Sequence, residues 1–308
     1  MTETEPTPAY LQLTDNQLAE RAAALRELMR ACRLCPRACG VDRLGGELGA
    51  CRTGERPVVS SYGPHFGEER PLVGRRGSGT VFLTHCNLRC IFCQNYDISQ
   101  LGDGRVTTAE RVAEMMLELQ QRGCHNINWV SPTHQVCALV EATVIARSRG
   151  LRVPIVYNCG GYESVETLEL LDGIVDIYMP DAKYGDNEVG RVLSGVPEYW
   201  DRCREALAEM HRQAGDLRAD SQGIATRGLL VRHLVLPEDM AKTTVVMEYL
   251  ASLSRDTYVN VMAQYRPSYR ARELAPISRA VTADEFRSAV QAALDAGLHR
   301  LDERWAGP

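Results

Sequence analysis

The sequence predicts an α/β protein built on a partial (β/α)6 barrel, with a small cysteine-rich extension in front of the barrel. Between residues 79 and 263, short apolar runs rich in β-branched residues alternate with segments of helical periodicity. This alternation is typical of a parallel β/α architecture. The chain has 308 residues, of which 44% are hydrophobic and 24% charged, so it can bury a full globular core.

Six apolar runs are the expected strands of this barrel. They span residues 79–83, 126–131, 153–158, 174–179, 229–236 and 258–263. Eight strands close a TIM barrel, so we expect an array of six that stays open along one side. Proteins of this architecture carry out their chemistry at the carboxyl ends of the strands. The residues that follow each run are therefore where a functional site is expected.

Helical periodicity appears between the strands and at both ends of the chain. Asp15 is a candidate cap for a first helix. Two pairs, Thr107 with Glu110 and Thr282 with Glu285, have the spacing of a capping box. The apolar positions expected to face the core include Leu18, Leu25, Val112, Leu119, Val136, Val140, Val165, Leu168, Trp200, Leu207, Phe286 and Val290.

The predicted elements divide the chain into three regions. Residues 1–75 would hold an irregular arm, a helix and a cysteine-rich metal-binding segment. Residues 76–275 would form the barrel, and residues 276–308 a last helix and a tail. Within the connecting stretch 52–77, the group around Glu68 and Glu69 is expected to be a solvated turn.

Composition and charge exclude several classes of protein. The formal net charge of −5 and the isoelectric point near 5.9 argue against a general binder of nucleic acid or anionic membranes. The first thirty residues lack the basic start and apolar stretch of a secretory signal. No stretch approaches the roughly 20 apolar residues of a membrane span. We therefore expect a cytoplasmic protein.

The chain contains 11 cysteines, and their pattern does not resemble a disulfide framework. Cys86, Cys90 and Cys93 follow directly on the first barrel strand in the spacing C-x3-C-x2-C. A [4Fe–4S] cluster takes one thiolate per iron, so three cysteines leave one iron open to a ligand that is not protein. Closed structural zinc sites have four protein ligands, and no nearby residue supplies the fourth. A cluster with one open iron is the better interpretation.

A second group of cysteines lies nearer the start of the chain. Cys32, Cys35, Cys39 and Cys51 fall within twenty residues, and glycine and proline residues between them allow tight turns. Four thiolates complete a four-coordinate site. A structural zinc ion and a second [4Fe–4S] cluster both suit these ligands. We favour the cluster because redox chemistry is expected nearby. Zinc is kept as the alternative.

The pattern C-x3-C-x-aromatic-C after a first strand resembles the radical S-adenosylmethionine (SAM) superfamily. Within it, the stretches 92–100 and 131–134 and the early cysteine block resemble an activating-enzyme-like group labelled PflX, related to pyruvate formate-lyase activating enzyme. This resemblance implies a partial (β/α)6 barrel, a [4Fe–4S] cluster and bound SAM. Activases with extra clusters usually carry the additional cysteines after the radical SAM loop, whereas here they precede it.

The same resemblance implies which residues contact SAM. Asp181 and Lys183 match the activating enzymes directly, while Asn158 and Cys159 stand where those enzymes have aspartate and threonine. Asp181 and Lys183 are two residues apart on a strand and share a face, which suits either a zwitterionic amino acid or a buried salt bridge. Asn158 lacks the carboxylate of its counterpart, so the sequence does not decide whether a monovalent cation binds there.

Further SAM contacts are expected at other strand ends and on the cysteine loop. Arg232 lies in an apolar strand, where an unpaired guanidinium is costly. A planar fork suits a carboxylate, and by resemblance its partner is the carboxylate of SAM. Many superfamily members have Gly-Gly-Glu where this chain has residues 131–134, so other groups there would replace it. The remaining candidates are Phe92, Asn95, Ser131, Thr133, His134 and Gln264.

These features predict an enzyme that cleaves SAM reductively, giving methionine and a 5′-deoxyadenosyl radical that removes hydrogen from a substrate. The electron would come from a protein of the flavodoxin or ferredoxin type. The substrate would be a backbone glycine of a glycyl radical partner enzyme. Alternatively, it would be a small metabolite such as a sugar, an amino acid or a natural-product intermediate. An interpretation of another class is a non-catalytic iron–sulfur or zinc protein.

Overall fold

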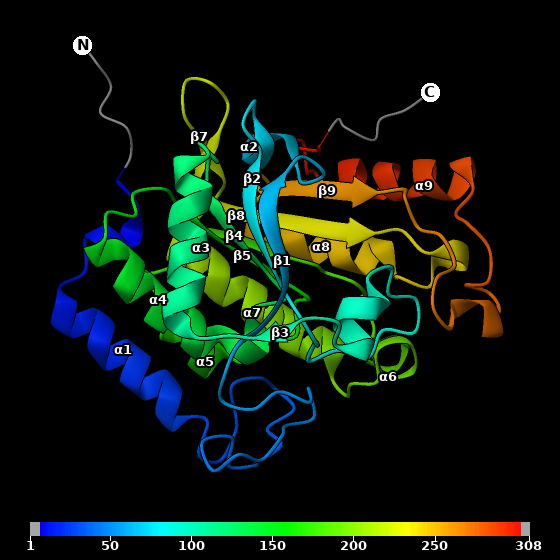
Figure 1. The fold of residues 1–308 in the computed structure, drawn as a ribbon. Helices are drawn as coiled ribbons and strands as arrows, with labels where there is room; N and C mark the ends of the chain where they lie inside the picture. The colour runs from blue at the N-terminus through cyan, green and yellow to red at the C-terminus, as the bar shows by residue number, and fades with distance from the viewer. Residues whose placement is uncertain (1–6, 303–308) are drawn as a thin grey trace.

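The structure is a computed structural model that describes residues 7–302. Six parallel strands form a curved sheet in the order β2, β4, β5, β6, β8 and β9 (Figure 1). Their bounds are Ser78–Leu83, Ile127–Val130, Ile155–Cys159, Ile177–Pro180, Ala225–Leu234 and Tyr258–Met262. Among the residues described, no pairing joins β9 back to β2. The expected open barrel of six parallel strands is confirmed.

Three further strands lie at the margins of this sheet. β1 (Val58–His65) runs antiparallel to β2, and β3 (Arg105–Val106) pairs with β1. The short β7 (Arg218–Ala219) lies antiparallel to β8. β3 and β7 are exposed two-residue strands, too short for an alternating pattern that a sequence could reveal.

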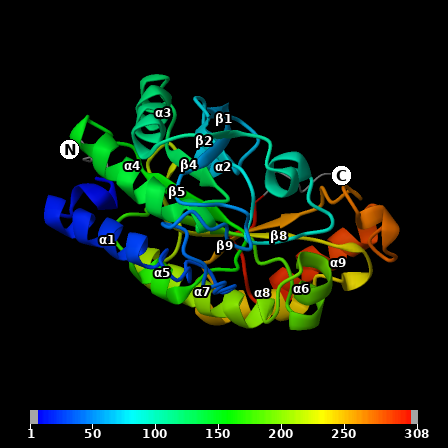
Figure 2. The same cartoon turned by 60° about the horizontal axis from the view of Figure 1, so that its bottom comes forward.

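Most of the helices cover the outer side of the barrel, and Figure 2 shows these arranged in an arc around the strands. Their bounds are α1 Asp15–Glu27, α2 Arg70–Val73, α3 Ala109–Gln121, α4 Val136–Ser148, α5 Val165–Glu169, α6 Asn187–Ser194, α7 Tyr199–Ala214, α8 Thr243–Leu253 and α9 Ala283–Asp295. The helices α2, α6 and α8 are additions to those predicted. No helix within residues 7–302 is both long and apolar enough to cross a bilayer.

The helix caps correct two expectations and confirm a third. Thr14, not Asp15, caps α1, because its extended backbone lets its hydroxyl accept from the N–H of Gln17. Thr108 caps α3 in the same way, one residue after Thr107. The capping box of Thr282 and Glu285 at α9 is confirmed. The initial arm and the tail are described only in part, since residues 1–6 and 303–308 lie outside the described residues.

The two faces of the sheet bury different side chains. Outward-facing residues such as Trp129 and Tyr157 pack among the helices in the main hydrophobic cluster. Inward-facing Val156, Ile177 and Leu230 pack with Leu72 of α2 in a separate apolar cluster. Strand residues two apart share a face, so the inward row continues from this cluster toward the carboxyl ends. The apolar cluster fills the amino half of the barrel and leaves the carboxyl half to polar groups.

Candidate functional site

A cavity of about 200 Å³ lies at the carboxyl ends of the strands. It brings together the cysteine loop after β2 and the ends of β4, β5, β6 and β8. The predicted site residues that line it are Cys86, Cys90, Phe92, Cys93, Asn95, Ser131, Asn158, Cys159, Asp181, Lys183 and Arg232. Segments separated by up to about half of the chain thus converge on one space.

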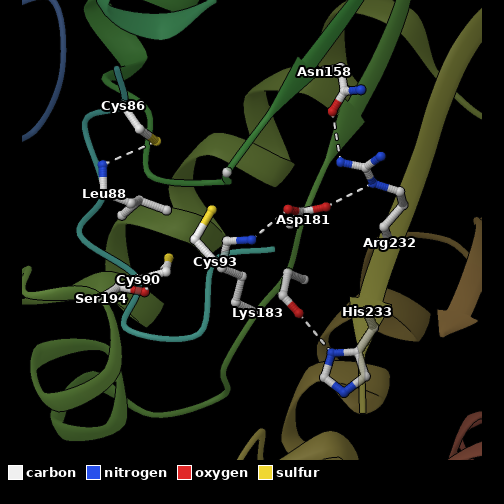
Figure 3. A network of polar contacts seen from close by, with 12 residues as sticks. Cys86, Leu88, Cys90, Cys93, Asn158, Asp181, Lys183, Ser194, Arg232 and His233 are labelled. Carbon is white, nitrogen blue, oxygen red and sulfur yellow. Dashed lines mark hydrogen bonds and ion pairs between the residues drawn. The ribbon is translucent and has the colours of Figure 1, made fainter. Parts of the chain in front are cut away.

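The three thiols of the cysteine loop border this cavity together (Figure 3). The N–H of Leu88 lies 3.4 Å from Cys86 Sγ. Ser194 Oγ lies 2.9 Å from Cys90 Sγ, and Ser99 Oγ lies 3.0 Å from Cys93 Sγ. Each sulfur therefore has a polar neighbour that can donate a hydrogen bond to a thiolate.

Burial controls the charge state of Cys86 and Cys90. It raises the pKa of Cys86 to about 12, and the neighbouring Cys90 adds to the effect. Burial also raises the pKa of Cys90, although Lys183 opposes the shift. Without bound metal, Cys86 and Cys90 stay protonated at neutral pH. Bound iron supplies the positive charge that a thiolate needs, so the loop suits a cluster and no ordinary nucleophile.

A network of charged and polar side chains lines the cavity wall beside the cysteines (Figure 3). It consists of Asn158, Arg232, Asp181 and Lys183. Arg232 donates from Nη2 to Asn158 Oδ1 and from Nε to Asp181 Oδ1, each over 2.7 Å. Lys183 Nζ lies 2.5 Å from Asp181 Oδ2. The buried salt bridge considered from the sequence is present, and in this structure the carboxylate facing Arg232 is that of Asp181.

The charged groups of this network stabilise one another. Burial acts to raise the pKa of Asp181, but Arg232 and Lys183 outweigh it and hold that pKa below its usual value. Burial acts to lower the pKa of Lys183, and Asp181 reverses the shift, so that the pKa is raised. At neutral pH the site therefore presents one carboxylate between two cations.

Glu68 and Glu69, expected in a solvated turn, are instead buried beside the charged network. This corrects that expectation. Glu68 Oε2 lies 3.5 Å from Arg232 Nη1. Burial raises the pKa of Glu68 to about 7, although Arg232 opposes the shift. Glu69 Oε1 accepts a hydrogen bond from Asn260 Nδ2 over 2.9 Å. Their neighbours in the barrel are distant in sequence, so local composition did not reveal them.

Three predicted site residues do not line the cavity. Thr133 Oγ1 donates to Glu163 Oε1 over 2.8 Å, and His134 Nε2 lies 2.9 Å from the carbonyl oxygen of Thr84. Gln264 Nε2 lies 3.2 Å from Met262 Sδ. The short 3-10 turn Thr133–Gln135 directs the first two side chains away from the cavity. Thr133, His134 and Gln264 therefore contact protein groups where contacts with SAM were expected.

The four cysteines of the N-terminal region line a second, smaller cavity. Cys32, Cys35, Cys39 and Cys51 border it together with Arg43 and His134. Burial raises the pKa of Cys35 to about 12. Within residues 7–302, no three His, Cys, Asp or Glu side chains converge at the spacing of a single bound ion. The thiols surround a space and do not meet at a point.

Comparison with known proteins places the chain in a family. Residues 80–216 match the Radical SAM superfamily. The chain is 30% identical over 287 residues to an uncharacterized protein of Methanocaldococcus jannaschii, spanning 90% of this chain and 78% of that protein. It is 25% identical over 195 residues to the pyruvate formate-lyase-activating enzyme of Listeria monocytogenes, spanning 59% of this chain and 73% of that enzyme. The chain belongs to the radical SAM superfamily.

Solved structures of other proteins align with much of this chain. Methylornithine synthase (PylB) aligns with 94% of this chain and 76% of its own, with 16% identity and a TM-score of 0.48. The cofactors of the superfamily are a [4Fe–4S] cluster and SAM. The residues present fit them: three thiols of one loop border a cavity whose wall also carries the paired charges of Asp181, Lys183 and Arg232.

Proposed function

We propose that this protein is a radical SAM enzyme whose cluster is held by Cys86, Cys90 and Cys93. The observation that carries the proposal is that these thiols line one cavity together with the charged side chains of Asp181, Lys183 and Arg232. When bound, the cluster supplies one electron to SAM, and SAM supplies the oxidising power that removes a hydrogen atom from a substrate. A cytoplasmic location, which we also propose, would keep the thiols reduced.

The side chains of the charged network would bind and orient SAM. Lys183 and Arg232 carry the positive charges suited to its carboxylate, and Asp181 carries the negative charge suited to its amino group. Asp181 also fixes both cations, because it lies 2.5 Å from Lys183 Nζ and 2.7 Å from Arg232 Nε. Asn158 holds the far side of the Arg232 fork. A preorganised set of charges of this kind binds without a large cost of rearrangement.

Phe92 would form an apolar wall of the SAM site. Its ring packs edge-on against Tyr184 and Tyr265, with centroids 6.3 and 5.8 Å away. These contacts restrict the orientation of the ring at the cavity wall. Asn95 and Ser131 border the same cavity, and we propose that they donate or accept hydrogen bonds at the edge of the nucleotide.

The proposed substrate is a backbone glycine of a partner enzyme, and the proposed electron donor is of the flavodoxin or ferredoxin type. The similarity to a pyruvate formate-lyase-activating enzyme supports this choice. A small polar metabolite is the second candidate.

Anaerobic incubation of reconstituted protein with SAM and dithionite tests the shared chemistry. We expect 5′-deoxyadenosine from the wild type and none from Cys86→Ala. Cys124→Ala is the matched control, because Cys124 is buried away from both cysteine groups, and it should retain the product. If the wild type yields no product, a non-catalytic iron–sulfur or zinc protein is the better interpretation.

A second measurement separates the two substrates. A glycyl radical signal in a co-expressed partner, detected by electron paramagnetic resonance, would identify a protein substrate. Incorporation of deuterium from a labelled metabolite into 5′-deoxyadenosine would identify a small one.

A further inference from the structure

A buried positive charge lines the four-cysteine cavity, and no carboxylate within residues 7–302 forms an ion pair with it. Arg43 is 1% exposed and donates from Nε and Nη2 to the carbonyl oxygen of Gly54, over 3.1 and 2.6 Å. Its Nη1 lies 3.8 Å from Cys32 Sγ. None of the ion pairs among residues 7–302 involves Arg43. A buried charge is costly unless it is paired. Four neutral thiols would leave it unpaired, whereas metal-bound thiolates would compensate it.

A buried histidine borders the same cavity with one nitrogen unused. His134 is 1% exposed, and its Nε2 lies 2.9 Å from the carbonyl oxygen of Thr84. A carbonyl can only accept, so Nε2 carries the proton of this contact. Nδ1 has no hydrogen-bond partner among the described residues. The Nε2 contact holds the ring in place as one buried wall of the four-cysteine cavity.

Gly49 shapes the wall between two of the sulfurs. A Cβ at this position would lie 3.3 Å from Cys39 Sγ and 3.4 Å from Cys51 Sγ. The two sulfurs therefore flank the glycine, and any side chain there would press on both. The close approach explains the glycine and offers a way to disturb the cavity without removing a thiol.

Reciprocal arginine contacts join the two cysteine groups. Arg37, which lies between Cys35 and Cys39, donates to the carbonyl oxygen of Asn87, next to Cys86. Arg89, which lies before Cys90, donates to the carbonyl oxygen of Ala50, next to Cys51. The cavities are therefore neighbours, held together by hydrogen bonds to residues adjacent to their thiols.

We propose that the four-cysteine cavity holds a second iron–sulfur cluster, ligated by Cys32, Cys35, Cys39 and Cys51, that passes electrons to the cluster at Cys86, Cys90 and Cys93. Four thiolates occupy all four irons, so this cluster has no open position for a substrate and is suited to electron transfer. Arg43 is its buried counter-charge. The acceptor half of the inference rests on the proposed function.

The transfer balances without bond making or breaking. A reduced flavin or iron–sulfur protein gives one electron to the four-cysteine cluster. That cluster is then oxidised by one electron as the three-cysteine cluster is reduced by one. No proton or group moves in either step. The charge of Arg43 beside Cys32 favours the reduced, more negative state.

Metal content tests the first half of the proposal independently of SAM cleavage. Two cubane clusters contain about eight irons, so anaerobically reconstituted wild type should contain about eight, and Cys32→Ala/Cys35→Ala about four. The triple variant Cys86→Ala/Cys90→Ala/Cys93→Ala should retain about four irons and an iron–sulfur spectrum. Zinc in the triple variant, or neither metal, would overturn the proposal. Cys124→Ala should equal the wild type.

The spectrum of the triple variant also tests Arg43. Arg43→Met removes the positive charge, so the reduction potential of the remaining cluster should become more negative in a potentiometric titration. Arg43→Lys should restore part of the shift. A potential that does not respond to either substitution would show that Arg43 is not the counter-charge of this site.

The electron-transfer half is tested by comparing two reductants. In Gly49→Ala and in Cys32→Ala/Cys35→Ala, 5′-deoxyadenosine formation should fall at least tenfold further with reduced flavodoxin than with dithionite, which can reach the three-cysteine cluster directly. Equal losses with both reductants would overturn the relay. Failure of the wild type with dithionite would instead count against the proposed function, and the iron content would still decide whether the second cluster exists.

Discussion

Arg232 donates from Nε to Asp181 Oδ1 over 2.7 Å, at the carboxyl ends of two neighbouring parallel strands. The contact is buried, and the same carboxylate lies 2.5 Å from Lys183 Nζ. One acidic side chain therefore fixes two cations on the wall of the cavity. Asp181 therefore positions both cations, in addition to its own proposed contact with the amino group of SAM.

Asp181→Asn should destabilise the protein and weaken SAM binding. The substitution leaves two buried cations without their shared carboxylate, and breaking a buried pair costs about 3–5 kcal/mol. Chemical denaturation should show a loss of this order, and equilibrium binding should show at least tenfold weaker affinity for SAM. Glu188→Gln is the control, because its ion pair with Arg191 is exposed, and it should alter neither quantity.

Arg232→Lys should weaken SAM binding while the charge is kept. Lysine lacks the planar fork that lets Arg232 contact Asp181 and Asn158 at once. We expect SAM affinity to fall at least tenfold, or about 1.4 kcal/mol, in anaerobic calorimetry. An unchanged affinity would show that charge alone is sufficient and that the geometry of the fork plays no part.

Glu163→Gln should flatten the pH dependence of stability. Burial raises the pKa of Glu163 from 4.5 to about 7, even though Thr133 and Tyr157 donate hydrogen bonds to it. Between these two pH values the folded protein holds a proton that the unfolded chain releases, so stability falls as pH rises. Glutamine resembles the neutral acid, and its variant should lose up to about 1.4 kcal/mol per pH unit of that slope.

The measurement for this prediction is the free energy of unfolding in urea at a series of pH values from 4.5 to 7. Glu68 and Asp176 also have raised pKa values, near 7, because they are buried, so part of the slope should remain in the variant. A variant with the full slope of the wild type would show that Glu163 is ionised throughout this range.

Much of the site follows from local patterns in the sequence. The spacing of Cys86, Cys90 and Cys93 places three thiols on one loop, and the two-residue separation of Asp181 and Lys183 places both on one face of a strand. These relationships depend only on the period of the local backbone. The strand-end rule then places Asn158 beside them. Arg232, which lies inside the expected strand 229–236, is indicated instead as a guanidinium in an apolar run, and it lines the same cavity.

Other features depend on contacts that no local pattern encodes. Ser194, at the end of α6, lies 104 residues from Cys90 and yet contacts its sulfur. His134 follows a strand end and would be assigned to the SAM cavity by position alone. Its ring lines the four-cysteine cavity instead, with the carbonyl of Thr84 as its partner. Long-range packing decides both cases.

Ser194→Ala should make the reduction potential of the three-cysteine cluster more negative. Ser194 Oγ lies 2.9 Å from both Cys90 Sγ and the hydroxyl of Tyr184. A hydroxyl that donates to a thiolate disperses its negative charge and favours the reduced cluster, so its removal should favour the oxidised one. A potentiometric titration followed by electron paramagnetic resonance measures the shift. The exposed Ser252, which donates to the carbonyl of Tyr249, supplies the control Ser252→Ala. Equal potentials in both variants would mean that the Ser194 hydroxyl points its proton toward Tyr184 and leaves Cys90 without a donor.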